Sequence, residues 1–575
     1  MRSFSVIFFC IFSFIATLII LILFNYYFTY KTINYIVSNN VNFYPALIGI
    51  IIFGAVLTSL SFSYEIPNLV KNICSVFFKR YVIKRQIAMV NSAVLPEQLP
   101  TIACAFTFCN DFLPDQALHS MEQDYPNIRW YILDDSTKPE TIKAIDEFAN
   151  QYHLTVVRRP QDGKRTKSAN LAHFWQTDPK EWDFFCQIDS GNILPKNFIS
   201  TNLKFFYAQK YTYKKYPIGV VYSAHVCMFH NNLYVNSHNY TSLMAIERDY
   251  FSALFPNRTK ICTWLCSKEL VLKIKDRIAD FVCDDSGIFY LSLQNGFLTL
   301  CSTLTTQLDI PPMNYIDQRK LYVRGLYFAI ESSKYFIKNI FKFRIPLTIM
   351  YTRVISTISL IIGPLNTVFS LTSPLIFNLL GYNQGGTYML FVLQILYTVI
   401  DIFITVIFIL KIKKWKNAIW YFLFDYPFYN ASLVFLQLEA WFLALFFNRR
   451  SYFVITPKFH RKFSFWATIY RNRRSFIIYL IFTSAYILTW FFLPDVPQAT
   501  IGFTLFNYYF DTHIPTFFLT LISYGFCQIG VIELTLLTNV KCNPQNDDLE
   551  NHNYQFDKYI RSFNFINKAL TKSAG

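Results

Sequence analysis

The sequence is poor in charge and in glycine. Only 15% of its 575 residues are charged, whereas 53% are hydrophobic, which is too apolar for an ordinary soluble enzyme. Glycine occurs 16 times, which excludes a collagen-like fibre, and the hydrophobic content excludes a disordered chain. The 12 cysteines form no CxxC pair, which argues against a zinc site and predicts reduced, buried thiols. The length and the apolar content together indicate a membrane protein with more than one anchor.

Six long apolar stretches are each able to cross a bilayer. A helix of about 20 residues spans the ~30 Å hydrocarbon core. The six stretches are 5–24, 43–62, 346–371, 386–410, 475–492 and 514–537. A seventh, 417–447, lies between two basic runs, so we expect it to lie in the cytoplasmic interface as one or two helices. Inside the predicted spans, ionisable side chains are candidates for lining a path through the membrane; these are Arg353, Asp401 and Glu533.

Basic residues are concentrated in a few of the connecting segments. Lysine and arginine number 53 against 36 acids, and they gather in 71–85, 411–416 and 449–474. By the positive-inside rule these segments face the cytoplasm, together with both termini and the region 63–345. The sequence therefore predicts a multi-pass protein of the plasma membrane. Its basic excess follows from this topology and from anionic lipid, so we expect no nucleic-acid partner.

Between residues 100 and 322 the composition is that of a globular α/β domain. Four short apolar runs in this region end in acids, at Asp111, Asp134–Asp135, Asp189 and Asp284–Asp285. We expect buried parallel strands that deliver these side chains from their carboxyl ends, which is how open α/β sheets build ligand sites. A helix N-cap would explain any single one of these acids, but four of them beside one basic loop favour a site.

The basic loop is the segment 163–170, which reads GKRTKSAN and leads into a predicted helix. Small residues with lysine and asparagine at the start of a helix suit an anionic phosphate, through backbone N–H groups and positive side chains. The loop is not a Walker A motif, because GxxxxGK[ST] is absent. A solvated loop explains the same residues equally well.

Taken in order, the motifs resemble those of family 2 glycosyltransferases with a GT-A fold. The layout is similar to that of processive membrane synthases of cellulose, curdlan and other β-glucans, and most of all to single-chain Gram-positive (1,3)-β-glucan synthases of the type 37 capsule kind. Five segments resemble family motifs: 167–170 the KAGN element, 189–192 the DxD motif, 283–285 the TED motif, 318–322 the QxxRW motif, and 453–458 the FxVTxK gating loop.

The resemblance implies a role for particular side chains. In TED the last acid is the general base, so Asp285 is the expected base, with Asp284 beside it in the catalytic motif. Tyr322 and Trp264 are expected at the acceptor sugar, and Asp189 with Asn192 at a Mg2+ or Mn2+ ion. The residues expected to bind the UDP-sugar are Asp111, Asp134, Asp135, Lys167, Asn170, Asp189, Gln318, Arg319, Thr456 and Lys458.

Three positions depart from the family pattern. Gly191 replaces the second acid of DxD, which removes one metal ligand unless Asn192 or a water takes its place. Leu321 replaces the arginine of QxxRW, and the charge of Arg319, Lys320 or Arg324 is the expected compensation. Tyr322 replaces the tryptophan that stacks on the acceptor, a contact that a tyrosine ring can also make.

The resemblance predicts an α/β GT-A domain inserted in an all-α transmembrane bundle of about six spanning helices plus interface helices. The expected parts are two spanning helices in 1–62, the cytoplasmic catalytic domain in 63–322, an interface helix in 323–345, two spanning helices in 346–411, interface helices in 412–448, the gating loop and a basic segment in 449–474, two spanning helices in 475–538 and a cytoplasmic tail in 539–575.

The predicted function is processive, inverting transfer of glucose from UDP-glucose to a growing β-glucan, which is then translocated across the plasma membrane. The 1,3-linked chain with 1,2 branches is a refinement that rests on overall layout. The expected partners are the UDP-sugar, the nascent polysaccharide and membrane lipid. Two alternatives stay open at this point: synthesis of another capsule or hyaluronan-like polymer from a different UDP-sugar, and a non-catalytic membrane scaffold or exporter.

Overall fold

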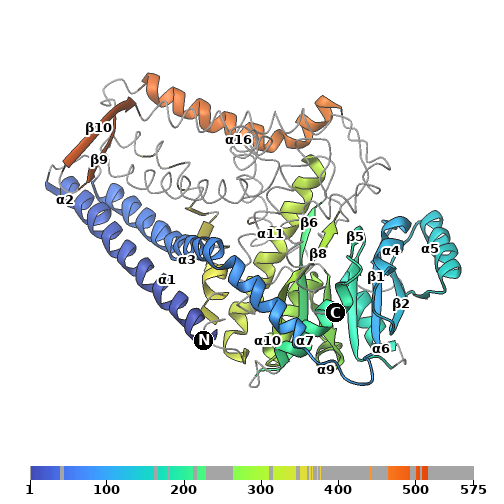
Figure 1. The fold of residues 1–575 in the computed structure, drawn as a ribbon. Coiled ribbons are helices and arrows are strands. Elements are labelled where there is room, and N and C mark those ends of the chain that lie inside the picture. Colours follow the sequence, from blue (N-terminus) through green and yellow to red (C-terminus); the bar gives the residue numbers. More distant parts are fainter. Residues whose placement is uncertain are drawn as a thin grey trace.

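The computed structural model describes most of the first 344 residues and parts of the remainder. The described residues are 2–38, 44–160, 166–177, 181–210, 216–227, 263–309, 315–344, 464–492, 500–505 and 508–515, with short runs between 350 and 376 and residue 441. A mixed α/β domain lies beside a set of long helices in this part of the chain (Figure 1).

The α/β domain is built on an eight-stranded sheet with the order β3-β2-β1-β4-β7-β6-β8-β5. The first four strands in this order run parallel, β7 is antiparallel to β4 and β6, β6 and β8 are parallel, and β5 is antiparallel to β8. The strands are β1 Ile102–Phe108, β2 Ile128–Asp134, β3 Thr155–Val157, β4 Phe184–Asp189, β5 Asn192–Ile193, β6 Ile218–Cys227, β7 Trp264–Ser267 and β8 Leu298–Asp309.

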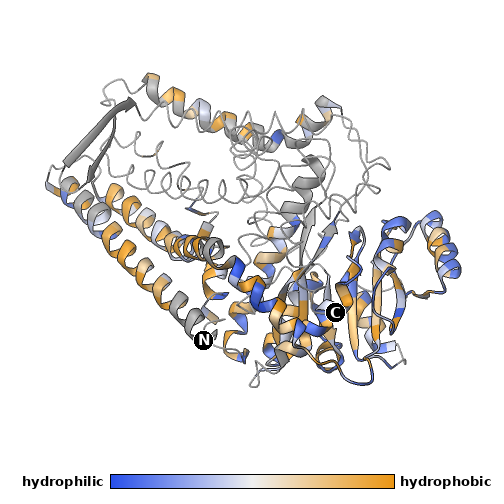
Figure 2. Cartoon of the chain, viewed as in Figure 1, coloured by the Kyte–Doolittle hydropathy of each residue, from blue (hydrophilic) through white to orange (hydrophobic). Residues whose placement is uncertain are grey.

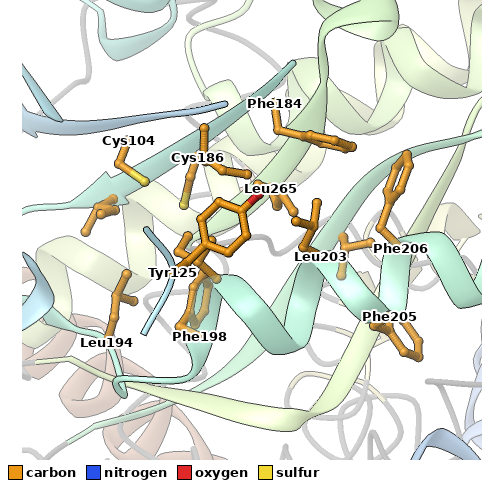
Figure 3. Close-up of a cluster of buried hydrophobic side chains, with 14 of the residues drawn as sticks. Cys104, Tyr125, Phe184, Cys186, Leu194, Phe198, Leu203, Phe205, Phe206 and Leu265 are labelled. Carbon is orange, nitrogen blue, oxygen red and sulfur yellow. The ribbon is translucent and has the colours of Figure 1, made fainter. Parts of the chain in front are cut away.

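Both faces of the sheet are covered, as the near-continuous hydrophobic strands predict. Every residue of β1 is buried, and its side chains alternate between two cores: Ile102, Cys104 and Phe106 in one, Ala103 and Ala105 in the other. The first core is closed by α4 Pro114–Met121, α5 Pro139–Tyr152, α7 Phe198–Lys210 and the end of α3 Tyr44–Asn91. Figure 3 shows part of it, in which Phe198 and Leu203 of α7 belong to the same cluster as Cys104 and Cys186.

The second core is closed by helices that come later in the chain. They are α6 Lys167–Thr177, α9 Lys268–Ile274, η3 Ile278–Asp280, α10 Asp284–Gln294, α11 Tyr315–Lys338 and η4 Ile340–Lys342. The run FVCDD at 281–285, expected to be a strand, is instead a bend that leads into α10. The prediction of a strand there was wrong because Asp284 and Asp285 sit in the first turn of a helix, where negative charge is favoured by the helix dipole.

The N-terminal helices are apolar along much of their length (Figure 2). They are α1 Arg2–Phe24, η1 Asn25–Tyr30, α2 Lys31–Ser38 and α3. α1 packs against α3, with the rings of Phe24 and Phe62 at 5.5 Å and nearly perpendicular. Among the described residues, one stretch, Pro45–Lys71 in α3, is long and apolar enough to cross a bilayer, and Cys10–Phe24 is a shorter apolar helix. The bundle of six spanning helices therefore stays a prediction.

Several predicted segments are described only in part. The span predicted at 475–492 lies in α16 Phe465–Phe492, and the segment after it contains a hairpin of β9 Thr500–Leu505 and β10 Tyr508–Pro515, which the sequence did not predict. The helix expected at 323–345 begins earlier, because α11 starts at Tyr315. The predicted span at 386–410, with Asp401, lies outside the described residues, as does the tail; of the predicted span at 514–537, with Glu533, only 514–515 are described, and they belong to β10.

Two residues assigned from the sequence to functional surfaces are buried in the structure. Arg353 is buried, and its guanidinium carbon lies 4.4 Å from the ring centroid of Phe289 in α10. Trp264, expected at the acceptor sugar, is 0% exposed and packs against Phe185 and Trp175 at ring distances of 5.6 and 6.4 Å. The assignment of Trp264 to the acceptor is corrected, because a ring with no exposed surface offers nothing for a sugar to stack on.

Trp264→Ala should destabilise the domain by about 3–5 kcal/mol, because it leaves a large cavity between two aromatic neighbours. Trp264→Phe should cost less, since most of the volume is retained. Thermal unfolding of the purified variants measures both. If Trp264→Ala left stability unchanged while weakening acceptor use, the packing assignment would be wrong.

Candidate active site

Three of the predicted acidic positions meet at one edge of the sheet. β1 lies between β2 and β4 and is parallel to both, with Phe108 opposite Asp134 and Thr107 opposite Asp189. Since the carboxyl ends of parallel strands end at the same edge, the residues after β1, β2 and β4 come together there. The prediction of buried parallel strands that end in acids is confirmed for these three strands.

Lys167 is the centre of the site. It is the first residue of α6, and its ammonium forms ion pairs with the carboxylates of Asp189 and Asp284, the latter at 2.9 Å. Burial opposes the positive charge, but Asp189, Asp284 and Asp285 together outweigh it and raise the pKa of Lys167 above its ordinary value. Lys167 is therefore a cation that joins the end of β4 to the start of α10.

Asp189 is held by its own strand as well as by Lys167. Its Oδ1 accepts hydrogen bonds from Gln187 Nε2 at 2.6 Å and from Thr107 Oγ1 at 3.5 Å. Its side chain keeps 34% of its surface exposed, which is the largest exposure among the ion-paired side chains at Lys167. The following turn passes through Gly191 at φ 83°, a left-handed conformation that favours glycine. Gly191, which removes an acid from the family pattern, thus satisfies a backbone requirement.

Asp284 and Asp285 enter the site from the first turn of α10. The side chain of Asp284 is 9% exposed, and burial, as the largest influence, raises its pKa, while Lys167 acts in the opposite direction. Asp285 is half-buried beside it. Two adjacent carboxylates with unequal environments, one tied to an ammonium and the other more accessible, are an arrangement that allows one of them to take up a proton.

Arg324 adds a second cation to the same cluster. It lies on α11, one turn before Tyr327 and Phe328, which pack against Val282 and Cys283 just before α10. Burial lowers the pKa of Arg324, and the charges of Cys283, Asp189, Asp284 and Asp285 act in the opposite direction. Of the candidates named from the sequence to replace the missing arginine at position 321, Arg324 is the one whose side chain is described in this place.

The loop after β1 is built around Asn110. Its backbone is left-handed, with φ 60°, and its Oδ1 accepts from the backbone N–H groups of Thr137 and Lys138, both at 2.9 Å. Asp111 accepts from the backbone N–H of Cys109 at 2.7 Å. These bonds tie the loops after β1 and β2 together, and they place Asp111 at the same edge as Asp189.

Asp134 and Asp135, both expected at the UDP-sugar, are instead paired within the protein. Asp134 has a fully buried side chain that accepts from Ser136 N and from Arg158 Nε at 2.8 and 2.7 Å. Asp135 forms a bidentate pair with Arg159, at 2.8 Å for the shortest bond. Because burial leaves Asp134 no surface for a ligand, we reassign it to the support of the site.

The two asparagines assigned to the site, Asn192 and Asn170, differ in their hydrogen bonds. Asn192 is buried, and its Nδ2 donates to Thr263 Oγ1 at 2.9 Å and to Gln307 Oε1 at 3.2 Å. Both bonds use the amide nitrogen, whereas a metal would bind the oxygen, so its assignment as a metal ligand stays a prediction. Asn170 is also buried, but no protein group among the described residues bonds to its Oδ1. Its assignment to the UDP-sugar stays a prediction.

The metal prediction fits this site in part. Within the described residues, no three His, Cys, Asp or Glu side chains group closely enough to hold a metal. Asp189 nevertheless offers a partly exposed carboxylate, and Mg2+ is commonly bound by one or two carboxylates together with substrate phosphates. The donor set of the chain therefore suits a metal that a diphosphate helps to hold, with Asp189 as the protein ligand.

Part of the predicted site lies outside the residues or the side chains that the structure describes. Thr456 and Lys458 of the expected gating loop lie outside the described residues. Gln318, Arg319 and Tyr322 lie on the first turns of α11, but only their backbone is described. Sequence reasoning missed Arg158, Arg159 and Gln187, although the adjacent arginines directly after β3, beside two acids after β2, were a readable signal.

Comparisons with known proteins give only remote likenesses. No family model and no curated protein matches the chain. A mannosyltransferase from Pyrobaculum calidifontis, solved with GDP-Man and Mn2+, is 12% identical with a TM-score of 0.40, over 62% of this chain and 99% of that one. TarS from S. aureus is 11% identical with a TM-score of 0.25, over 48% of this chain and 85% of a 1–349 fragment, or 53% and 54% for a longer form. At these scores the likeness carries no argument, so the function must rest on the site.

The pairing of Asp135 with Arg159 can be tested against its predicted role at the donor. Removing one partner of a buried ion pair should cost about 3–5 kcal/mol of stability, so Asp135→Asn and Arg159→Gln should each lower the unfolding temperature clearly. The double variant should recover part of the loss. Thermal unfolding with and without UDP separates the two roles: a weaker UDP affinity at full stability would restore Asp135 to the donor site.

Proposed function

We propose that the chain is an inverting glycosyltransferase that takes its sugar from a nucleoside diphosphate donor. The single observation that carries the proposal is the cluster in which Lys167 joins Asp189 and Asp284, with Asp285 and Arg324 within electrostatic reach. Sugar transfer of this kind needs positive charge for a leaving diphosphate and a base for an attacking hydroxyl, and the cluster supplies both kinds of group.

The cations serve the leaving group. As the anomeric bond breaks, negative charge develops on the diphosphate, and fixed positive groups in a poorly hydrated site stabilise it strongly. Lys167 and Arg324 are such groups, since each is partly or largely buried beside acids that keep it in place. A divalent metal held by Asp189 would, when bound, add further neutralisation of the same charge. Asp189 would hold that metal at the edge of the sheet.

The acids serve the acceptor. Asp284 is tied to Lys167, which leaves Asp285 as the residue to take the proton from the acceptor hydroxyl. Attack from the side opposite the diphosphate inverts the anomeric carbon, so an α-linked donor gives a β-linked product. Asp284 then acts by holding Lys167 and by fixing the first turn of α10.

We further propose that the donor is UDP-glucose and that the product is a β-glucan, extended processively and passed through the membrane. Support comes from the order of the sequence motifs and from the apolar helices that adjoin the catalytic domain. A hydrophilic polymer needs a lined path across hydrocarbon, because unsatisfied hydroxyl groups there are costly. Multi-pass insertion in the plasma membrane with a cytoplasmic catalytic domain is part of this proposal.

The decisive experiment supplies the purified full-length protein with radiolabelled UDP-glucose, and separately with UDP-GlcNAc and UDP-GlcA, in the presence of Mg2+ or Mn2+. High-molecular-weight label from UDP-glucose alone, digestible by a β-1,3-glucanase, is the expected result. Polymer from the other donors alone would replace the glucan by a hyaluronan-like product. Release of UDP from none of them would favour a scaffold or exporter and overturn sugar transfer.

Asp285→Asn should lower the rate of sugar transfer by about 10²–10⁴-fold, which is what a positioned general base contributes. The amide has nearly the same size, so the amount of folded protein should not change. The rate of UDP release under saturating donor, measured at matched protein level, checks this. Ordinary turnover by Asp285→Asn would remove Asp285 from the role of base.

A further inference from the structure

Gln86 is a buried polar residue on the last turns of α3, with 4% of its surface exposed. Its neighbours on the helix, Ile83, Ile87 and Val90, pack into the first core of the catalytic domain. The same helix contains the apolar stretch Pro45–Lys71. Burying a neutral amide in this apolar contact costs free energy unless both its donor and its acceptor form hydrogen bonds.

Gln86 uses both its donor and its acceptor in hydrogen bonds to β8, at a point where that strand is irregular. β8 pairs with β6 up to Ser302, opposite Ser223, and resumes at residue 306, opposite Ala224, so residues 303–305 have no register partner on β6. Such a bulge leaves backbone groups without ladder bonds. Gln86 Oε1 accepts from the N–H and the hydroxyl of Thr303 at 2.9 and 2.6 Å, and Gln86 Nε2 donates to the carbonyl of Cys301 at 3.2 Å.

A second buried amide secures the bulge from the side of α7. Asn202 Nδ2 donates to Ser223 Oγ at 3.0 Å and to Thr305 Oγ1 at 3.1 Å, and the two hydroxyls are themselves hydrogen-bonded. The bulge is therefore fixed by Gln86 on α3 and by Asn202 on α7. Since bulges redirect a strand, these contacts set the course of β8 beyond residue 305.

Beyond the bulge, β8 supports the turn that carries Asp189. Its last residues pair with β5, Leu308 opposite Ile193 and Asp309 opposite Asn192. Gln307 accepts from the buried amide of Asn192, and Asn192 directly follows the Asp189–Gly191 turn. Hydrogen bonds from α3 to β8 and from β8 to β5 are thus connected, along the chain, to the turn that follows Asp189; Figure 1 shows α3, β8 and β5 in the fold.

We propose that Gln86 is a positioning residue through which α3 fixes the place of the Asp189 turn. The coupling between Gln86 and the Asp189 turn does not depend on the proposed function. Its consequence for sugar transfer rests on that function, in which Asp189 lies at the diphosphate. In this arrangement the predicted membrane helix and the donor site move as one unit. Glutamine suits the position because it supplies a donor and an acceptor at the end of one side chain.

Gln86→Met keeps the length of the side chain and removes all three bonds, and hydrogen exchange of the full-length protein measures the result. We expect amide exchange in 304–309 and 189–193 to become about tenfold faster, because buried backbone groups lose their partners, while β1 stays unchanged. Thr303→Val, which removes only the hydroxyl bond, should give a smaller rise in the same segments. Ile83→Val, a buried neighbour without polar contacts, is the packing control and should change neither segment.

Two outcomes would overturn the inference. Faster exchange confined to 301–305 would show that the bulge is not coupled to the Asp189 turn, and an equal rise in β1 would show a general loss of stability. Should Gln86→Met fail to fold, Thr303→Val decides between the same outcomes. Hydrogen exchange is measured without turnover. A wild-type protein that transfers no sugar would therefore disprove the proposed function but would not bear on the coupling between Gln86 and the Asp189 turn. With activity present, Gln86→Met should lower kcat about tenfold, since Asp189 and the Lys167 ammonium paired with it would be less precisely positioned.

Discussion

The arrangement of the site depends on one ammonium group held among carboxylates. Without Lys167, Asp189 and Asp284 would be two like charges brought together in a poorly hydrated place, and burial already disfavours the ionised form of Asp284. Lys167 makes this grouping possible and also joins three parts of the chain: the start of α6, the end of β4 and the first turn of α10. The same charge that stabilises the fold of the site is the charge that a leaving diphosphate requires.

The sheet brings these parts together in two different ways. The parallel half, β1, β2 and β4, delivers Asp111 and Asp189 to one edge by its direction alone. The mixed half, where β8 bulges and pairs with β5, fixes the turn after Asp189 from the other side. Both halves are covered on each face by helices, and the end of α3 is one of them, so the apolar N-terminal region and the α/β domain share a core.

The ion pairs around β2 show how a sequence motif can be satisfied internally. Asp134 and Asp135 follow a buried strand, as acids in a ligand site do, but Arg158 and Arg159 follow β3, the neighbouring strand, and neutralise them. Whether an acid at a strand end faces a ligand or a partner depends on what the adjacent strand delivers. The acids and the arginines are more than twenty positions apart in the sequence, so a single motif does not contain this information.

The sequence by itself determined the parallel strands that end before Asp111 and at Asp134 and Asp189, and the start of a helix at Lys167, since unbroken apolar runs and their polar ends are local properties. It did not determine that 281–285 is a helix start, that Trp264 and Asn192 are interior, or that Gln86 reaches β8. These were decided by the tertiary structure, because burial and hydrogen-bond partners depend on residues far away in the sequence, 71 positions for Asn192 and Thr263 and 217 for Gln86 and Thr303. A side chain suited to a ligand is equally suited to a buried bulge or core.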